Sequence, residues 1–442
     1  MKPLALCLLV TCFSLTSGRA VGQEKKEARK TSVLFKNALI FDGRRLLDGK
    51  RDLLVVNNKF AQCSKEPIKA PEGAIVVDAD GLVLMPGMID AHVHLMLPLT
   101  IEELQKADDS YISLRAADEA KRMLHRGFTT VRDTGGATFG LKRAIDEGLI
   151  EGPRIFPSGA AISQTGGHGD FRRRPDRPRR WDGKLDRFER LGLMTLADGR
   201  DEVLAATREQ LRLGATQIKL MAGGGVASEF DPLDVSQYLD DELRAAVEAA
   251  ADWGTYVTVH AYNPRAINRA ISAGVKCIEH GQLMDEATLK CLVEKEVFLS
   301  PQVMIYQQPF AGLDEAREAK RRQVLDGMDV MFRLAKKYDV KVCFGTDLVF
   351  SRELFSRQST ELTAREKWFT PVEILRQATS TNGELLTLSG RRNPYGKLGV
   401  IEEGALADLL LVKGNPLEKL SLLEDPDNLV VIMKDGKIYK RP

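Results

Sequence analysis

Residues 82–94 read LVLMPGMIDAHVH, and this stretch decides the fold. Its apolar run predicts a strand over Leu82–Ile89, and two histidines, His92 and His94, follow with one residue between them. Because alternate residues of an extended chain share a face, both imidazoles point the same way. Parallel α/β folds carry their functional side chains at the C-terminal ends of the strands. The stretch therefore predicts the first strand of such a fold, with a functional site at its end.

The chain that follows alternates short apolar runs with helical stretches, which is typical of βα units. Helices are predicted over Asp201–Leu213, Asp240–Trp253 and Glu315–Lys337. Eight strands in this arrangement favour a closed (β/α)8 barrel of the TIM type over an open doubly wound sheet. The strands predicted are Leu82–Ile89, Thr129–Arg132, Arg154–Pro157, Gln217–Met221, Tyr256–Val259, Val275–Ile278, Val297–Leu299 and Val340–Phe344.

Both ends of the chain have a different pattern, in which short alternating strands are broken by turns. Runs such as Val33–Phe35 and Leu53–Val56 lie between Asp-Gly and Asn-Asn turns, and the last fifty residues repeat this style. We predict that the two ends form one small β-sandwich domain from residues 23–86 and 393–442. The barrel then occupies residues 87–392.

The first 22 residues are similar to a secretory signal peptide. They have a basic start at Lys2, an apolar run over Leu4–Leu15 and small residues for cleavage near Ala20. The apolar run is too short to span a bilayer, which favours a signal peptide over a signal anchor. We expect an exported protein, secreted or periplasmic, with no membrane partner once the signal is removed.

Composition narrows the class of partner. The 442 residues include 64 Lys and Arg against 62 Asp and Glu, and 43% are hydrophobic. These values exclude disordered, collagen-like and small disulfide-rich proteins. Because basic and acidic residues are nearly equal in number, the chain shows no basic surface of the kind that binds nucleic acid. The four cysteines that follow the signal leave one disulfide possible. We expect a small-molecule or peptide substrate and no nucleic-acid partner.

Three more candidate site residues lie where predicted strands end: His260, His280 and Asp347. A barrel brings its strand C-termini to one face, so these residues become neighbours of His92 and His94. Each histidine alone is more simply a surface or hydrogen-bonded residue, but four of the six histidines share this position. Imidazole and carboxylate together suit zinc or another divalent metal. His125, inside a helical run, is interpreted as structural.

Lys219 lies within the apolar run Gln217–Met221. Burial penalises the charged form of lysine, lowers its pKa and exposes a nucleophilic amine. The simpler alternative is a lysine that extends to the rim of the sheet. An uncharged amine can instead take up CO₂ as a carbamate, whose two oxygens are able to bridge two metal ions.

These residues, together with the segments Leu84–His94, Cys277–Gly281 and Gly404–Leu409, resemble the amidohydrolase superfamily of binuclear metal enzymes. The similarity runs from about residue 32 to the C-terminus. Within it, Ile162–Asp170 and His260–Tyr262 look like the prolidase-type branch, which includes Xaa-Pro dipeptidases, acyl-amino-acid carboxypeptidases and ochratoxin-type amidases. All six ligand types are present, so nothing indicates a decayed homologue.

The resemblance implies two Zn²⁺ ions per subunit, or another divalent metal, in a homo-oligomer. It implies that carboxylated Lys219 bridges the two ions and that Asp347 acts as the catalytic proton acceptor. His168 and Tyr262 resemble positions that bind the free carboxylate of the substrate. A loop histidine and an ordinary supporting phenol are the plainer alternatives for these two. The implied metal ligands are His92, His94, Lys219, His260, His280 and Asp347.

Three other features are interpreted as structural. Gly223–Gly225 lacks the Lys-Ser/Thr of a phosphate-binding loop and is expected to let the chain bend close to the site. Arg132 and Asp133, at the end of the second strand, are expected to support it. The arginine-rich insertion over residues 171–190 is expected to be a solvated loop, although an arginine there is also placed to hold a carboxylate.

Together these features predict a metal-dependent amidohydrolase that cleaves the amide bond of dipeptides or N-acyl amino acids with a metal-activated water. The nearest alternative is a cyclic amidase, similar to imidazolonepropionase, or a lactonase on the same scaffold. A non-catalytic binding protein is the alternative from a different class, since barrels host such roles too.

Overall fold

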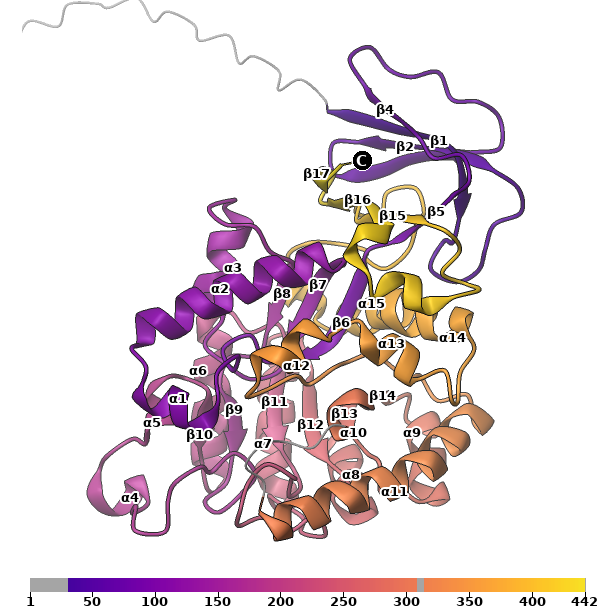
Figure 1. The fold of residues 1–442 in the computed structure, drawn as a ribbon. Coiled ribbons are helices and arrows are strands. Elements are labelled where there is room, and N and C mark those ends of the chain that lie inside the picture. Colours follow the sequence, from indigo (N-terminus) through magenta and orange to yellow (C-terminus); the bar gives the residue numbers. More distant parts are fainter. Residues whose placement is uncertain (1–30, 308–313, 442) are drawn as a thin grey trace, which may run out of the picture.

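The computed structural model describes residues 31–307 and 314–441, so the predicted signal peptide, residues 1–22, lies outside the described residues. A sheet made from both ends of the chain lies at one end of the molecule, where indigo and yellow ribbons meet (Figure 1). The larger α/β part carries the strand ends that hold the candidate site. Among the described residues, no helix combines the length and the hydropathy that crossing a membrane would require.

The sheet made from both ends has eight strands in the order β17-β16-β15-β5-β1-β2-β3, with β4 paired to β1. Strand β1 belongs to both halves, because its start pairs with β2 and β4 and its end pairs with β5. Apolar residues from both halves, such as Phe35 and Leu411, share one buried cluster. The strands are β1 (Ser32–Ile40), β2 (Arg51–Val56), β3 (Lys59–Ser64), β4 (Ile75–Asp78), β5 (Leu82–Pro86), β15 (Leu409–Lys413), β16 (Leu429–Lys434) and β17 (Lys437–Lys440).

The α/β part contains two parallel sheets, ordered β6-β7-β8 and β10-β9-β11-β12-β13-β14. Six of the eight predicted strands are present in these sheets at nearly the predicted places. Short strands β9 and β10 were not predicted; β9 continues the line of β8 after a break. The strands are β6 (Met88–Val93), β7 (Phe128–Asp133), β8 (Arg154–Pro157), β9 (Ala161–Ser163), β10 (Met194–Leu196), β11 (Ile218–Met221), β12 (Val257–Ala261), β13 (Cys277–His280) and β14 (Phe298–Ser300).

The predicted first strand, Leu82–Ile89, is wrong as a single element. The chain leaves the terminal sheet after β5 and enters the α/β part with β6, and Gly87 lies between them. A Cβ at Gly87 would lie 2.2 Å from Thr129 Oγ1, so only glycine lets the chain cross so close to β7. An apolar pattern alone does not reveal that one run serves two sheets.

The predicted eighth strand, Val340–Phe344, is present only as a single bridge between Val342 and Leu299. On the side of β6, the Asn382 side chain supplies hydrogen bonds that a regular strand would make through its backbone. Asn382 Nδ2 donates to the carbonyls of Ile89 and Phe344, at 2.7 Å each, and Asn382 Oδ1 accepts from the Phe344 amide. The segment therefore joins β6 through this amide side chain and a single backbone hydrogen bond, from Ala91 N to Phe344 O, rather than through a regular ladder.

The two parallel sheets approach a ring without one continuous ladder. At one junction the Thr216 amide donates to Pro157 O at 2.8 Å, and at the other the Ala91 amide donates to Phe344 O at 2.9 Å. These contacts connect β8 to the start of β11 and the 341–344 segment to β6. The arrangement is that of a TIM-type barrel, interrupted at the third and eighth strand positions.

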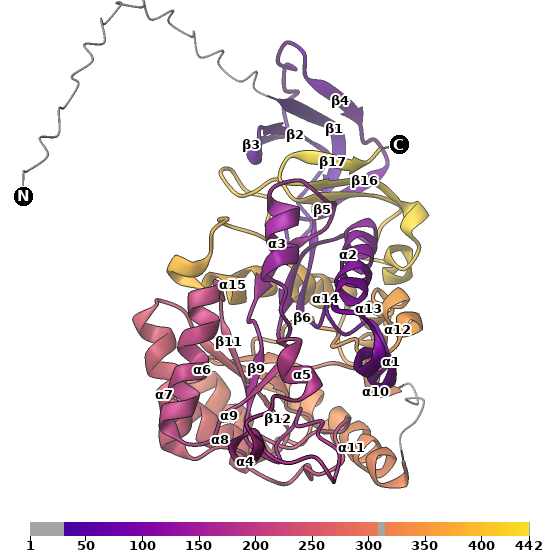
Figure 2. The same cartoon turned by 90° about the vertical axis from the view of Figure 1, so that its left-hand side faces the viewer.

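Helices cover the outside of the sheets, as Figure 2 shows for α6 and α7. The three predicted helices are found as α6, α7 and α11. Capping residues set the limits of helices such as α8. It begins after Asn263, whose side chain accepts from the Ala266 amide, and ends at Gly274 with φ 104°. The helices between the barrel strands are α1 (Ile101–Lys106), α2 (Asp109–His125), α3 (Phe139–Asp146), α4 (Arg179–Asp182), α5 (Arg187–Arg190), α6 (Arg200–Leu213), α7 (Asp240–Asp252), α8 (Pro264–Ala273), α9 (Glu286–Glu294), α10 (Met304–Gln307) and α11 (Glu315–Lys337).

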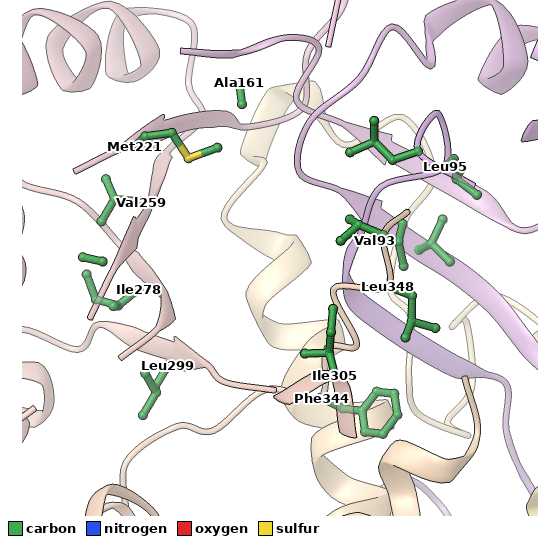
Figure 3. Packing of buried hydrophobic residues seen from close by; sticks show 14 of the residues in the cluster. Val93, Leu95, Ala161, Met221, Val259, Ile278, Leu299, Ile305, Phe344 and Leu348 are labelled. Carbon is green, nitrogen blue, oxygen red and sulfur yellow. The ribbon is translucent and has the colours of Figure 1, made fainter. Parts of the chain in front are cut away.

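The segment after the eighth strand position is largely helical as far as Arg392. It contains α12 (Arg352–Ser356), α13 (Thr360–Ala364), α14 (Pro371–Arg376), a π-helical turn over Gln377–Thr381 and α15 (Asn382–Thr387). Barrel strands and loops contribute Val93, Val259, Ile278 and Phe344 to one large apolar cluster (Figure 3). This packing fixes the strand ends on which the site residues lie.

Candidate metal centre

Three of the candidate metal ligands, His92, His94 and Asp347, lie in direct contact. His92 Nε2 is 3.3 Å from His94 Nε2. Asp347 Oδ1 lies 3.3 Å from His92 Nε2 and 3.2 Å from His94 Nε2. The Asp347 backbone amide also donates to His92 O at 2.8 Å, which brings the eighth strand position to the end of β6. The structure thus brings together residues that are far apart in sequence.

The other two histidines border the same point. The rings of His260, on β12, and His280, at the end of β13, have centroids 4.2 Å apart. His280 Nδ1 lies 4.0 Å from Asp347 Oδ2. Ligand atoms of His92, His280 and Asp347 all lie within 4.8 Å of one another, a spacing that suits one metal ion. His260 and His280 therefore lie at the same centre as His92, His94 and Asp347.

Lys219 reaches the same centre from β11, where it lies opposite Thr258. It is buried, with 1% of its surface exposed, and this burial lowers the pKa of its amine. Its charge also acts on the pKa of all four histidines, so the amine lies among them. Within the described residues its amine has no hydrogen-bond partner. Lys219 is therefore an embedded lysine, and the alternative of a lysine at the rim is wrong.

The electrostatics give His260, His280 and Asp347 the forms that bind metals. Burial holds the pKa of His260 and of His280 well below the usual range, so both imidazoles are neutral. Burial alone would raise the pKa of Asp347, but the charge of His92 and the hydrogen bonds from His92 and His94 outweigh it and hold that pKa well below 3.8. Neutral imidazoles and an ionised carboxylate are the forms that ligate metal ions.

Two of these residues have a backbone conformation that L-residues seldom adopt. His280 has φ 75° and Asp347 has φ 51°. Such left-handed residues persist only where the surroundings fix them, and they concentrate at functional sites. Both side chains are turned inward at the points where their chain segments leave the barrel.

A buried ion pair supports His92, and the sequence analysis did not predict it. Glu279 Oε2 lies 2.8 Å from His92 Nδ1, and Arg132 Nη2 donates to Glu279 Oε1 at 2.5 Å. Arg132 Nε also donates to Ala91 O at 2.6 Å. Arg132 therefore has the supporting role expected of it, and it acts through Glu279. The signal for Glu279 was present, since it is an ionisable residue within an apolar strand, as Lys219 is.

Asp90 and Gln302 hold the same residues from other sides. Asp90 Oδ1 accepts from the amides of His92 and Thr346, at 3.1 Å each, and so ties β6 to the loop of Asp347. Gln302 Nε2 lies 3.1 Å from His92 Nδ1. Partners of this kind orient ligand side chains in metal sites.

A cavity of about 1030 Å³ opens over this centre and is lined by Asp347, His260, His168 and Tyr262. The Tyr262 hydroxyl lies 2.6 Å from that of Tyr306, which in turn lies 3.0 Å from His280 Nδ1. Tyr306 was not predicted, and it also lines the cavity. His168 and Tyr262 thus line the cavity beside the candidate centre.

His168 is held in place by packing and by hydrogen bonds. Its ring stacks on that of His260 at 4.1 Å, and its Nδ1 lies 2.6 Å from Ser228 Oγ and 2.9 Å from Asp231 Oδ2. A Cβ at Gly225 would lie 2.1 Å from the His168 ring. Glycine there allows the close approach that the sequence predicted. His125, by contrast, ends α2 beside Glu151 and lies apart from the centre.

Comparison with known proteins gives several matches of high coverage. The profile described as "Amidohydrolase family" matches residues 83–439. Ochratoxinase of Aspergillus niger is 30% identical over 390 residues, which cover 81% of this chain and 76% of that protein. A crystal structure described as an amidohydrolase has a TM-score of 0.86 at 38% identity, and that of a prolidase complexed with N-methylphosphonate-L-proline has 0.85 at 36%; each covers 93% of this chain and 100% of the other.

Proposed function

The chain belongs to the amidohydrolase family, and from this premise we propose that it is a binuclear metal hydrolase of dipeptides and N-acyl amino acids. Family membership makes it a hydrolase of amide C–N bonds. The finer proposal rests on one observation, the contact of Asp347 with His92 and His94 beside two neutral histidines and the Lys219 amine.

The donor set fits two zinc ions or a similar divalent pair. His92, His94 and Asp347 would hold one ion, and His260 and His280 the other. Lys219 would bridge them as a carbamate, formed when its uncharged amine adds CO₂ and releases one proton. When bound, the ions lower the pKa of a water and polarise the amide carbonyl.

The side chains of the protein then direct the reaction. Asp347 is ionised because its pKa is low, so it can accept the proton of the attacking water and deliver it to the departing nitrogen. Glu279 holds the His92 ring through Nδ1 and leaves Nε2 facing Asp347. His168 and Tyr262 would bind the free carboxylate of the substrate and place its amide bond over the centre.

A substrate panel tests the proposal. The purified protein, loaded with zinc, would be assayed on Xaa-Pro and Xaa-Phe dipeptides and acyl-amino acids beside hydantoins, imidazolones and lactones. We expect hydrolysis of the linear amides. Activity confined to the cyclic compounds would favour the cyclic amidase or lactonase alternative. A protein that binds no stoichiometric metal by elemental analysis would favour the non-catalytic binding protein.

Residues 1–22 extend the proposal to an exported enzyme. Their basic start and short apolar run support export, and N-terminal sequencing of the protein from whole cells tests it. A mature chain that begins after residue 22 is expected, whereas an intact Met1 would contradict export by cleavage. The subunit count of the proposed homo-oligomer is measured by light scattering, and a monomer would contradict that part.

A further inference from the structure

A second basin adjoins the active-site cavity and has a different charge. It has a volume of about 730 Å³, and its lining side chains include seven basic and two acidic ones. Most come from the arginine-rich insertion, residues 171–190, and the rest from the end of α1. The active-site cavity, by comparison, has acidic and basic side chains in nearly equal number. The basin is therefore the electropositive part of this face.

The two acids of the basin are already engaged. Asp176 accepts from the backbone and the guanidinium of Arg173 at 3.0 to 3.2 Å. Asp186 caps α5, where it accepts from the amides of Phe188 and Glu189. Four of the seven cations are paired: Lys106, Arg172, Arg173 and Arg187 with Glu102, Asp170, Asp176 and Asp109. Arg177 and Arg190 are exposed and form no ion pair with any described residue, and Lys184 is an exposed residue of the same lining. Arg177 and Arg190 thus leave the basin with positive charge that no described acid pairs.

Hydrogen bonds fix the wall of the basin, and the basin directly adjoins the active-site cavity. Arg187 donates to the carbonyls of Leu104 and Ala107, at 3.3 and 2.7 Å, and so ties the insertion to the end of α1. Phe171 contacts Phe350, a residue of the active-site cavity, with ring centroids 6.1 Å apart. Gln105 lines both spaces. A ligand that fills the cavity can therefore continue into the basin.

We propose that the basin binds acidic residues of a peptide whose scissile amide lies in the active-site cavity. This inference rests on the proposed function and specifies its substrate class: peptides with acidic residues on the acyl side, beyond the bond that is cut. Carboxylates suit the basin because arginine guanidinium groups bind them in a fixed geometry. The insertion is then a part of the substrate site rather than only a solvated loop.

Direct binding tests the basin without any turnover. The probe is N-acetyl-tetraglutamate amide, and its neutral counterpart is N-acetyl-tetraglutamine amide, both titrated calorimetrically into the full chain. We expect the acidic peptide to bind about tenfold more tightly, and Arg177→Glu with Lys184→Glu to remove that difference. The matched control reverses Arg174 and Arg180, which are exposed on the same insertion but outside the basin lining. It should leave the preference unchanged.

Two results would overturn the inference: equal binding of both peptides, or an equal loss in the control. A second arm compares kcat/KM for tetrapeptides with Glu or Gln at their first two positions. The basin variant should lose the preference for Glu and keep its rate on the neutral peptide. If the protein hydrolyses no amide but still selects the acidic probe, the proposed function fails and the basin stands. If it hydrolyses amides without such selection, the basin alone fails.

Discussion

Glu279 and His92 face each other across the barrel at 2.8 Å, although β13 and β6 are not neighbours in either sheet. The ion pair of Glu279 with Arg132 is fully buried, so both charges depend on one another. His92 therefore takes its orientation from an ion pair that contacts no substrate.

Replacement of this carboxylate should weaken metal binding. Glu279→Gln leaves Arg132 with an uncompensated buried charge, which costs about 3–5 kcal/mol of unfolding free energy. Loss of the partner of His92 should also lower metal affinity about 10–100-fold. Urea unfolding and metal titration measure the two effects. Glu119→Gln, which breaks the Arg126 pair outside the centre, should lower stability and leave affinity intact. Equal affinity in both variants would contradict the role of Glu279.

Asp347→Asn should separate chemistry from metal binding. The amide cannot accept a proton from water, so kcat should fall about 10²–10⁴-fold. Metal content, measured by elemental analysis, should fall much less, because four histidines and Lys219 remain. A parallel loss of metal and turnover would mean that Asp347 serves mainly as a ligand.

Lys219 should respond to bicarbonate. Reconstitution of the metal-free protein with zinc should give higher activity when bicarbonate is present, because the carbamate needs CO₂. Lys219→Met should bind fewer metal ions per chain and ignore bicarbonate, while the exposed Lys121→Met should behave as the unmodified protein does. An unmodified amine in a high-resolution map of the zinc-loaded protein would contradict the bridge.

Tyr306→Phe should affect substrate binding more than the chemical step. It removes the partner of the Tyr262 hydroxyl, so we expect KM to rise about tenfold and kcat to change less than about threefold. Tyr238→Phe, which removes a buried phenol that bonds Ala197 O, is the control and should change neither constant. A fall in kcat at unchanged KM would place Tyr306 in the reaction itself.

Lys434 should make stability depend on alkaline pH. Burial lowers its pKa from 10.5 to about 8. Below pH 8 both states are protonated, and the folded state bears the cost of a buried charge. Between pH 8 and 10.5 the folded protein releases this proton before the unfolded chain does, so stability rises by about 1.4 kcal/mol per pH unit. Urea unfolding of Lys434→Met should lack this rise, and the exposed Lys437→Met should keep it.

The fold was predictable where local pattern decides it. Apolar runs bounded by turns predicted six barrel strands, and the helical pattern predicted α6 almost to the residue. The division at Gly87 and the Asn382 amide were not predictable, because each depends on contacts with residues remote in sequence. The apolar pattern of a strand does not indicate which sheet the strand joins.

The residues that gather at the candidate site were predictable from the sequence, but the residues that support them were not. His92, His94, His260, His280 and Asp347 were found because strand ends of a barrel converge. Glu279 and Tyr306 were not predicted because their roles depend on contacts with His92 and Tyr262, which are remote in sequence. The argument that identified Lys219 also applies to Glu279 in the strand Cys277–His280, because a buried carboxylate needs a charged or hydrogen-bonding partner.

The pairing of β5 with β15 has a consequence for the order of folding. Pro86 lies opposite Leu409, so most of the polypeptide must emerge before the edge of β5 meets its partner. Closing so long a loop costs entropy that only the completed body can offset. Until then β5 presents unpaired backbone groups. Strand β15 therefore closes this edge late in synthesis, and chains that end before β15 keep an open edge prone to association.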